Sequence, residues 1–353
     1  MRPYTAILII PTGVGAAIGG YAGDALPVAK AMAEVCDVLI THPNVLNGAM
    51  LYWNLPNALY VEGFGIDKFA EGCWGLQPIH QNKIGLILDR GIEPDLRLRN
   101  IQAADAARAT LGLNLTDYVV TDAPLNVELR SAESGASWGT IGNPDSLLRA
   151  AEVLINKAGA SAIAVVARFP DNLDEEAEQN YREGNGVDLI AGAEAVISHL
   201  IVREFQIPCA HSPIFSPPPL DANLSPRSAA EEIGYTFLPS VLVGLSRAPQ
   251  FVSKDSNSAS NSNNDIWVNQ IDAVVVPANA CGSSALLSLS QKNIQIITVE
   301  ENQTQMQVTT QALGIKTISA SSYLEAIGIL AARKAGVNPS TLSSTIFTLQ
   351  QLV

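Results

Sequence analysis

Residues 272–301 carry the pattern that most constrains the fold. They read as a buried strand, a turn of small polar residues, a short helix and a second buried strand. The start of the chain repeats this plan: an apolar run meets Pro11, a cluster of glycines follows, and a helix over residues 25–35 leads to a strand over 37–41. Parallel sheets place ligands at the carboxyl ends of such strands. Both turns are therefore expected to line a crevice.

Apolar runs of strand length alternate with helical patterns along the rest of the chain. This alternation predicts an α/β fold of mostly parallel sheets flanked by helices. A length of 353 residues exceeds what one core usually accommodates, so we expect two similar lobes around a cleft, residues 1–145 and 146–353. Residues 253–264 are rich in Ser and Asn and predict a flexible loop. Residues 51–64 and 72–80 read as irregular, and 128–142 as a surface loop.

Composition restricts the partners and the compartment. A net charge of −13 argues against nucleic acid and against an anionic membrane surface. Apolar residues make up 47% and charged residues only 16%, which predicts a homo-oligomer that hides surface between subunits. Four dispersed cysteines suit a reducing compartment, so a cytoplasmic location is expected. Arg2 and the apolar run after it imitate a secretory signal, but Pro11 and the glycines that follow favour the strand and turn.

The first glycine turn is a candidate anion site. Gly13, Gly15 and Gly19 follow a strand, as in a loose dinucleotide fingerprint, and would let the backbone approach a phosphate. The acid expected at the end of the second strand is missing, which favours a smaller anion or simple close packing. Two arginines that each end an apolar run are expected to hold a carboxylate or phosphate, with surface ion pairs as the alternative. The expected ligand contacts are Thr12, Gly13, Gly15, Asn44, Asn47, Arg168, Arg247, Asn279, Gly282 and Ser283.

Histidine and cysteine supply the candidate chemistry. His42 stands at a strand end and can titrate near neutral pH. Cys209 and His211 follow another apolar run, and Cys281 lies in the turn of the opening stretch, where a helix N-terminus would lower the pKa of its thiol. The expected catalytic residues are His42, Cys209, His211, Cys281 and Glu300. A turn histidine bonded to backbone, a cysteine buried as a small apolar residue, and a glutamate capping a solvated turn remain the alternatives.

Two further patterns carry less information. A metal bound by His42, Cys209, His211 and Glu300 lacks any paired-ligand spacing, so no metal is expected. In the segment GAEAVISH, Glu194 and Ser198 share a helix face with His199 beside them, which an ordinary polar stripe explains equally well.

Short motifs run from end to end of the chain: IPTGVGAAIGGYAGDA, THPNVLNGA, GAEAVISH, IPCAHSP, VGLSRAP and VVPANACG. Together they resemble an uncharacterised family of cyanobacteria and plants, a domain of unknown function. The resemblance implies a soluble, stand-alone protein and supplies no activity. The turn PANACGSSA separately resembles the cysteine turns of the aspartate/glutamate racemase group.

The residues therefore predict a soluble enzyme acting on a small polar, anionic metabolite between two lobes. Its reaction would use Cys or His acid–base chemistry of the racemase, lyase or hydrolase type. The alternative is a regulatory protein that binds a nucleotide or another anion without turnover. The sequence identifies no cofactor.

Overall fold

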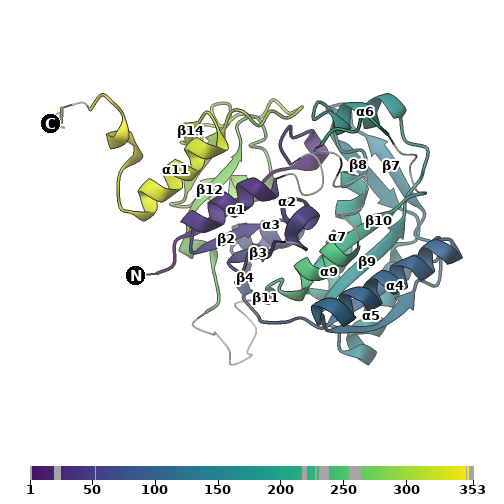
Figure 1. Cartoon of the computed structure of the whole chain (residues 1–353). Coiled ribbons are helices and arrows are strands. Elements are labelled where there is room, and N and C mark those ends of the chain that lie inside the picture. Colours follow the sequence, from purple (N-terminus) through teal and green to yellow (C-terminus); the bar gives the residue numbers. More distant parts are fainter. Residues whose placement is uncertain are drawn as a thin grey trace.

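The structure, a computed structural model, describes residues 2–19, 25–51, 53–216, 221–226, 229, 238–253, 264–346 and 348–349. It confirms an α/β fold in which parallel sheets are flanked by helices (Figure 1). The loop expected at residues 253–264 lies almost wholly outside the described residues. In the described part of the chain, no helix is both long enough and apolar enough to cross a bilayer.

The first sheet has six parallel strands in the order β14-β13-β12-β1-β2-β3. Their bounds are β1 (Thr5–Leu8), β2 (Val38–Thr41), β3 (Ala58–Tyr60), β12 (Ile271–Pro277), β13 (Gln295–Val299) and β14 (Ile318–Ala320). The strand order reverses between β1 and β12, as in doubly wound dinucleotide-binding folds. The two strands that begin the repeated pattern in the sequence, β1 and β12, are therefore neighbours in the sheet.

Both faces of the first sheet are buried because its strands are apolar on both sides. Ala6 and Leu8 of β1 belong to the core beneath α1 (Leu26–Val35) and α11 (Tyr323–Lys334). Ile7, between them in the chain, belongs to the core beneath α3 (Gly63–Glu71) and α10 (Ser284–Ser290). This alternation is the period of two that strand geometry imposes.

The second sheet has four parallel strands in the order β10-β9-β5-β6. Its strands are β5 (Ile84–Leu88), β6 (Leu115–Val120), β9 (Ala162–Arg168) and β10 (Cys209–Ile214). Its helices are α4 (Pro94–Leu111), α5 (Pro144–Ala158), α7 (Ala191–Phe205) and α9 (Leu238–Ser246). Cys209 and Ile163 pack toward α5 and α7, and Ala210 and Val166 pack toward α9.

The two sheets share one core. The same cluster of buried residues contains Leu8 of the first sheet, Val166 of the second and Leu242 of α9, and α9 packs on α2 (Pro43–Met50). The first sheet takes strands from both ends of the chain and the second from the middle (Figure 1). The boundary expected between residues 145 and 146 falls inside the second sheet, because β5 pairs with β9.

Three segments that read as irregular form regular elements. Residues 51–64 contain β3, and residues 72–80 contain β4 (Trp74–Gln77), which pairs with β11 (Gln250–Ser253). The expected surface loop at 128–142 is an antiparallel hairpin of β7 (Val127–Ser131) and β8 (Ser137–Ile141). These strands are short. Some pair with a strand that is distant in the sequence and others are half exposed, so the alternation of apolar and polar residues that marks a strand is weak in them. The remaining elements are η1 (Thr12–Val14), α6 (Glu175–Arg182), η2 (Val268–Gln270) and η3 (Pro339–Leu342).

Candidate functional site

The glycine turn after β1 lies at the switch point, but the chain itself packs against it. Gly15 has a φ of +73°, and a Cβ there would stand 2.9 Å from both the Gly186 carbonyl oxygen and Cγ of Gln305. A Cβ on Gly13 would stand 3.2 Å from Oγ of Ser137. These glycines are needed for close packing of the chain on itself.

The opposing turn after β12 holds a neighbouring loop. Asn279 Oδ1 accepts hydrogen bonds from N–H and Oγ1 of Thr304 at 3.2 and 3.1 Å, and its Nδ2 donates to the Thr304 carbonyl at 3.0 Å. The N–H of Cys281 donates to the Val308 carbonyl, and a Cβ on Gly282 would stand 3.1 Å from Val308. The polar groups expected to meet a ligand therefore engage residues 304–308.

The expectation that a helix N-terminus lowers the pKa of the Cys281 thiol is wrong. The side chain is fully buried, and its sulfur lies 3.5 Å from the carbonyl oxygens of Pro277 and Ala278. Burial raises the pKa of the thiol to about 11. Ser283, rather than Cys281, caps α10 by accepting from the N–H of Leu286. Cys281 thus precedes the cap and gains little from the helix dipole.

His42 bonds to the backbone through Nε2 and does not present this nitrogen to a ligand. Its Nε2 accepts a hydrogen bond from the N–H of Ile10 at 3.0 Å, which fixes the end of β1. Desolvation lowers the pKa of His42 to about 4, so the ring is neutral at ordinary pH. Asn44, two residues later, donates from Nδ2 to Oγ1 of Thr12 at 2.8 Å.

The expected charged contacts lie apart from these turns. Arg168 ends β9 in the second sheet and pairs with Asp171 at 2.5 Å and Glu93 at 3.0 Å, which matches the ion-pair alternative. Arg247 is exposed at the end of α9. Glu300 is exposed after β13 and accepts from Oγ of Ser319 at 2.6 Å.

A second polar group of residues lies where the edge of the first sheet meets α7. After β3 the chain reaches Glu62, the N-cap of α3, whose Oε2 accepts from the N–H groups of Phe64 and Gly65 at 2.9 and 3.3 Å. Its other oxygen, Oε1, lies 2.8 Å from Nε2 of His199 on α7. One carboxylate therefore begins a helix and holds an imidazole.

The contacts continue from α7 to β10. Ser198 Oγ lies 3.4 Å from Glu62 Oε1 and 3.2 Å from Nδ1 of His211. His211 Nε2 lies 3.4 Å from Oε1 of Glu194, one turn before Ser198 on α7. We call these five residues, Glu62, Glu194, Ser198, His199 and His211, the junction network.

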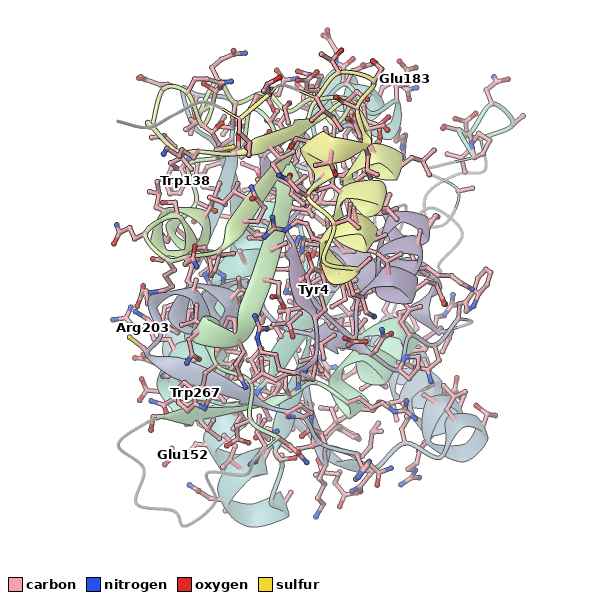
Figure 2. The ribbon with its side chains drawn as sticks, turned by 90° about the vertical axis from the view of Figure 1, so that its left-hand side faces the viewer. Tyr4, Trp138, Glu152, Glu183, Arg203 and Trp267 are labelled. Carbon is pink, nitrogen blue, oxygen red and sulfur yellow. The ribbon has the colours of Figure 1, made fainter. Side chains whose placement is uncertain are left out.

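Most of the junction network is buried, and one end reaches solvent. The side chains of Glu62 and Glu194 are 5% and 9% exposed, whereas that of His199 is 40% exposed. Further along α7, Arg203 lies at the surface (Figure 2). Burial opposes the charged form of His199, but the hydrogen bond and charge of Glu62, with the charge of Asp67, raise the pKa of His199 above its usual value.

Neutral polar groups surround the buried end of the network. The hydroxyl of Tyr60 donates to Oδ1 of Asn47 at 2.6 Å. Burial raises the pKa of Tyr60 and of the Cys209 thiol well above their usual values, so both stay protonated. Cys209 is therefore an inert neighbour of the network.

Three expected site residues, His211, Cys209 and Asn47, lie in or beside the junction network. The polar stripe of Glu194, Ser198 and His199 supplies its helix side. Sequence reasoning missed Glu62, because a single acid after a three-residue strand carries little pattern. Its position before Gly63, at the start of a helical stretch, is the N-cap signal that could have found it.

Metal binding finds no support in the geometry. Within the described residues, no three His, Cys, Asp or Glu side chains are arranged to hold a metal ion. His42, Cys209, His211 and Glu300 do not form such a group.

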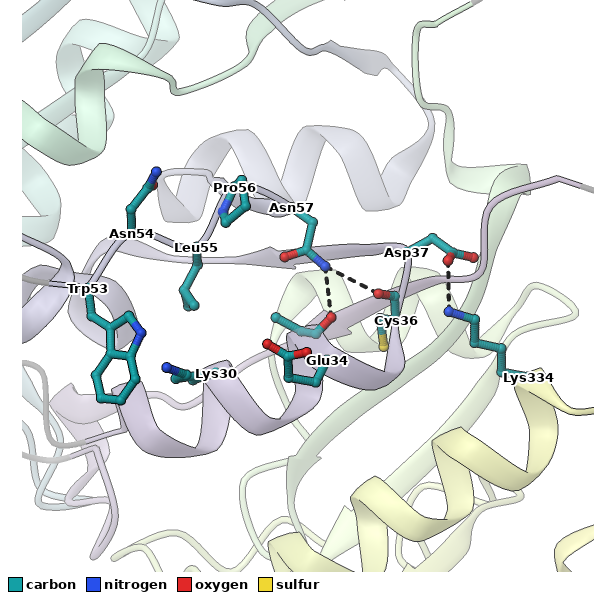
Figure 3. Close-up of a pocket in the computed structure, with 11 residues that line it drawn as sticks. Lys30, Glu34, Cys36, Asp37, Trp53, Asn54, Leu55, Pro56, Asn57 and Lys334 are labelled. Carbon is teal, nitrogen blue, oxygen red and sulfur yellow. Dashed lines mark hydrogen bonds and ion pairs between the residues drawn. The ribbon is translucent and has the colours of Figure 1, made fainter.

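A separate hollow of about 470 Å³ lies at the other end of the first sheet's strands (Figure 3). Lys30 of α1 stands over the indole of Trp53, 2.7 Å from the ring centroid. Asn57 donates to the Ala33 and Cys36 carbonyls at 2.7 and 3.2 Å and so caps the end of α1. The hollow lies at the amino ends of β2 and β3, away from the edge where parallel sheets bind ligands.

Similarity to known proteins extends over nearly the whole chain. The family described as "Protein of unknown function (DUF3326)" matches residues 5–343. The chain belongs to this family. The match includes both sheets and every member of the junction network, and the DUF3326 description assigns no activity.

A relative from Synechococcus sp., named an uncharacterized lipoprotein, is 57% identical over 342 residues, 97% of this chain and 94% of the relative. Its name overturns the expected cytoplasmic location, which rested on the dispersed cysteines and on the interpretation of the N-terminus as a strand and turn. A crystal structure of a periplasmic ribose ABC transporter from Conexibacter woesei aligns with 61% of this chain and 89% of its own, at 14% identity and a TM-score of 0.18. At that score the likeness carries no conclusion.

Proposed function

We propose that this DUF3326 protein is an acid–base enzyme that moves a proton on a small polar substrate at His199. The supporting observation is the pair formed by His199 and Glu62: Nε2 is held at 2.8 Å by a carboxylate that is 5% exposed, while 40% of the imidazole side chain is open. Among the described residues Nδ1 has no hydrogen-bond partner. A fixed imidazole with one free nitrogen is the arrangement of a general base.

The chemistry follows from the protonation states of this pair. Nδ1 of neutral His199 takes a proton from a carbon or oxygen acid of the substrate, and the resulting imidazolium is stabilised by the Glu62 carboxylate. The same nitrogen returns the proton to the substrate at another position or face. The cycle needs no further reactant, so an isomerase or racemase type of reaction fits best.

The charges of the site bear on the substrate. Glu62 and Asp67 place carboxyl groups beside His199, and these acids favour a neutral or cationic substrate over the anionic metabolite that the sequence suggested. The thiol part of the expected chemistry has no support, because Cys209 and Cys281 are buried and their pKa values are raised.

Deuterium exchange tests this function. The protein is incubated in D2O with a panel of 2-amino acids, amino-acid amides and ketoses, and carbon-bound deuterium is followed by NMR. Wild type should label at least one compound, His199→Gln should lower the rate by about 100-fold or more, and His80→Gln, at an exposed histidine, should leave it unchanged. Absence of labelling by wild type, or equal rates for His199→Gln, would refute the proposal.

The rival function, an anion sensor without turnover, draws on the dinucleotide-like strand order of the first sheet. The contacts of Gly15 and Asn279 with the chain itself make it the weaker candidate.

Two further features, the oligomeric state and the location of the protein, extend our proposal. Exposed apolar side chains, including Leu324 at 80%, support a homo-oligomer, whose mass by light scattering should exceed 37.3 kDa. The name of the Synechococcus relative supports a location at a membrane, which fractionation of native cells would test.

A further inference from the structure

The inner half of the junction network is a second carboxylate–imidazole pair that the proposed reaction does not use. His211 and Glu194 lie 3.4 Å apart, and their side chains are 10% and 9% exposed. Ser198 stands between this inner pair and the outer pair of Glu62 and His199, within 3.2 Å of one and 3.4 Å of the other. Two such pairs joined by a single hydroxyl are not explained by holding His199 alone.

The hydroxyl of Ser198 has one proton and four possible acceptors within 3.4 Å: Nδ1 of His211, Oε1 of Glu62, and the carbonyl oxygens of Glu194 and Ala195 in its own helix. If it donates to His211 Nδ1, then His211 carries its proton on Nε2 and donates to Glu194, and the inner imidazole is neutral. If it donates instead to Glu62 or to a carbonyl of its own helix, Oγ can accept from a protonated Nδ1 of His211 while Nε2 donates to Glu194. The second arrangement makes the inner imidazole a cation.

We propose that His199 and His211 share one excess proton through Ser198, so that the inner pair takes up positive charge when His199 is neutral. The network then contains two carboxylates and one imidazolium in either state. The two states differ in the site of one proton, Nδ1 of His199 or Nδ1 of His211, and in the acceptor to which the Ser198 hydroxyl donates. This inference rests on the proposed function for its use in a reaction, but the coupling itself does not require turnover.

The groups that face the network support this charge balance. Tyr60 on β3 and Cys209 on β10 are kept neutral by burial, which raises the pKa of each. Asp67 on α3 acts on His199 at the outer end, and burial raises the pKa of its carboxyl. Helix α9, which packs on β10, carries no titratable side chain, and neither does α2. Charge on the inner side is therefore set by Glu194 and His211.

NMR titration of the histidine side chains tests the coupling in the full chain. In His199→Gln the midpoint of the His211 titration should rise by about one pH unit or more, a tenfold change in proton affinity. The reason is that the shared proton can no longer bind at residue 199. In Glu194→Gln the midpoint of His199 should rise by a similar amount. An unchanged midpoint in both variants would overturn the proposal.

Variants of Ser198 show whether the hydroxyl carries the coupling. Adding Ser198→Ala to His199→Gln should abolish the shift at His211, and Ser198→Thr, which keeps a hydroxyl, should restore it. Ser246→Ala is the matched control, since that buried hydroxyl on α9 donates to the Val243 carbonyl of its own helix at 2.6 Å. A shift that survives Ser198→Ala would refute the role of Ser198. Coupling without deuterium exchange would reject only the proposed function, and exchange without coupling would reject only this inference.

Discussion

The switch-point turns and Glu62 of the junction network all follow the carboxyl ends of strands in the first sheet, yet their polar groups have different partners. At the switch point, Asn279 and the N–H of Cys281 contact backbone groups of residues 304–308. At the junction, Glu62 contacts His199 and Ser198 from another layer of the fold. A strand end therefore marks where a site can lie. Which side chains meet there depends on the element that packs opposite.

The largest expected difference between the two regions is in stability. Glu62→Ala removes the acceptor for two backbone N–H groups and leaves His199 without its carboxylate. The lost N-cap contacts cost about 0.5–2 kcal/mol of the free energy of unfolding. The lost contact with His199, whose side chain is 40% exposed, adds less than about 1 kcal/mol. Glu300→Ala, at an exposed acid of the switch point, should change it by about 0.5 kcal/mol or less.

Urea denaturation of both variants and of Glu62→Gln measures these costs. Glu62→Gln keeps an oxygen for the N-cap contacts, so its cost should be smaller than that of Glu62→Ala. If Glu62→Ala costs no more than Glu300→Ala, the junction network is not a stabilising contact between the layers.

The next effect is the pH dependence of stability, which has opposite signs at His42 and His199. The pKa of His42 falls from 6.5 to about 4 on folding. Its contribution to stability is therefore present above pH 6.5 and is lost as the pH falls toward 4. The loss is about 3 kcal/mol, since the unfolded chain binds the proton more tightly.

Comparing wild type with His42→Gln isolates this contribution. The glutamine can still accept from the N–H of Ile10 but does not titrate, so it should be less sensitive to acid between pH 6.5 and 4. Equal acid sensitivity in denaturant titrations would show that His42 is not a buried neutral ring.

A smaller effect is expected at Asn279. Asn279→Ala leaves the N–H and carbonyl of Thr304 without their side-chain partner, and each lost bond of this kind costs about 1 kcal/mol. Thermal unfolding should therefore show a loss of about 1–2 kcal/mol. A stabilised variant, or one that gains affinity for inorganic phosphate, would indicate that Asn279 instead guards an anion site.

The sequence predicted much of the framework because its signals are local. Apolar runs such as residues 271–277 and glycine turns such as that at Gly15 depend on neighbours in the chain, and the structure confirms parallel sheets flanked by helices. The candidate site was harder, because its residues are brought together by packing between layers. His211 was expected from its place after an apolar run, whereas Glu62 meets its partners because α7 packs on α3, the helix that Glu62 caps. Cys281 shows the converse, since a turn that looked open is covered by residues far along the chain.

The smallest effect concerns His199 itself and runs opposite to that of His42. Its pKa is raised on folding, so its stabilising contribution is complete below the unfolded value of 6.5 and is lost as the pH rises through the folded value. The side chain is 40% exposed, so solvent and salt screen the pair and the contribution should stay below about 1 kcal/mol. The melting temperature of wild type should therefore exceed that of His199→Gln by more at pH 6 than at pH 9, and 0.5 M NaCl should reduce the difference. If the gap instead widens as the pH rises, His199 is neutral throughout this range, and the proton transfer proposed for it loses its basis.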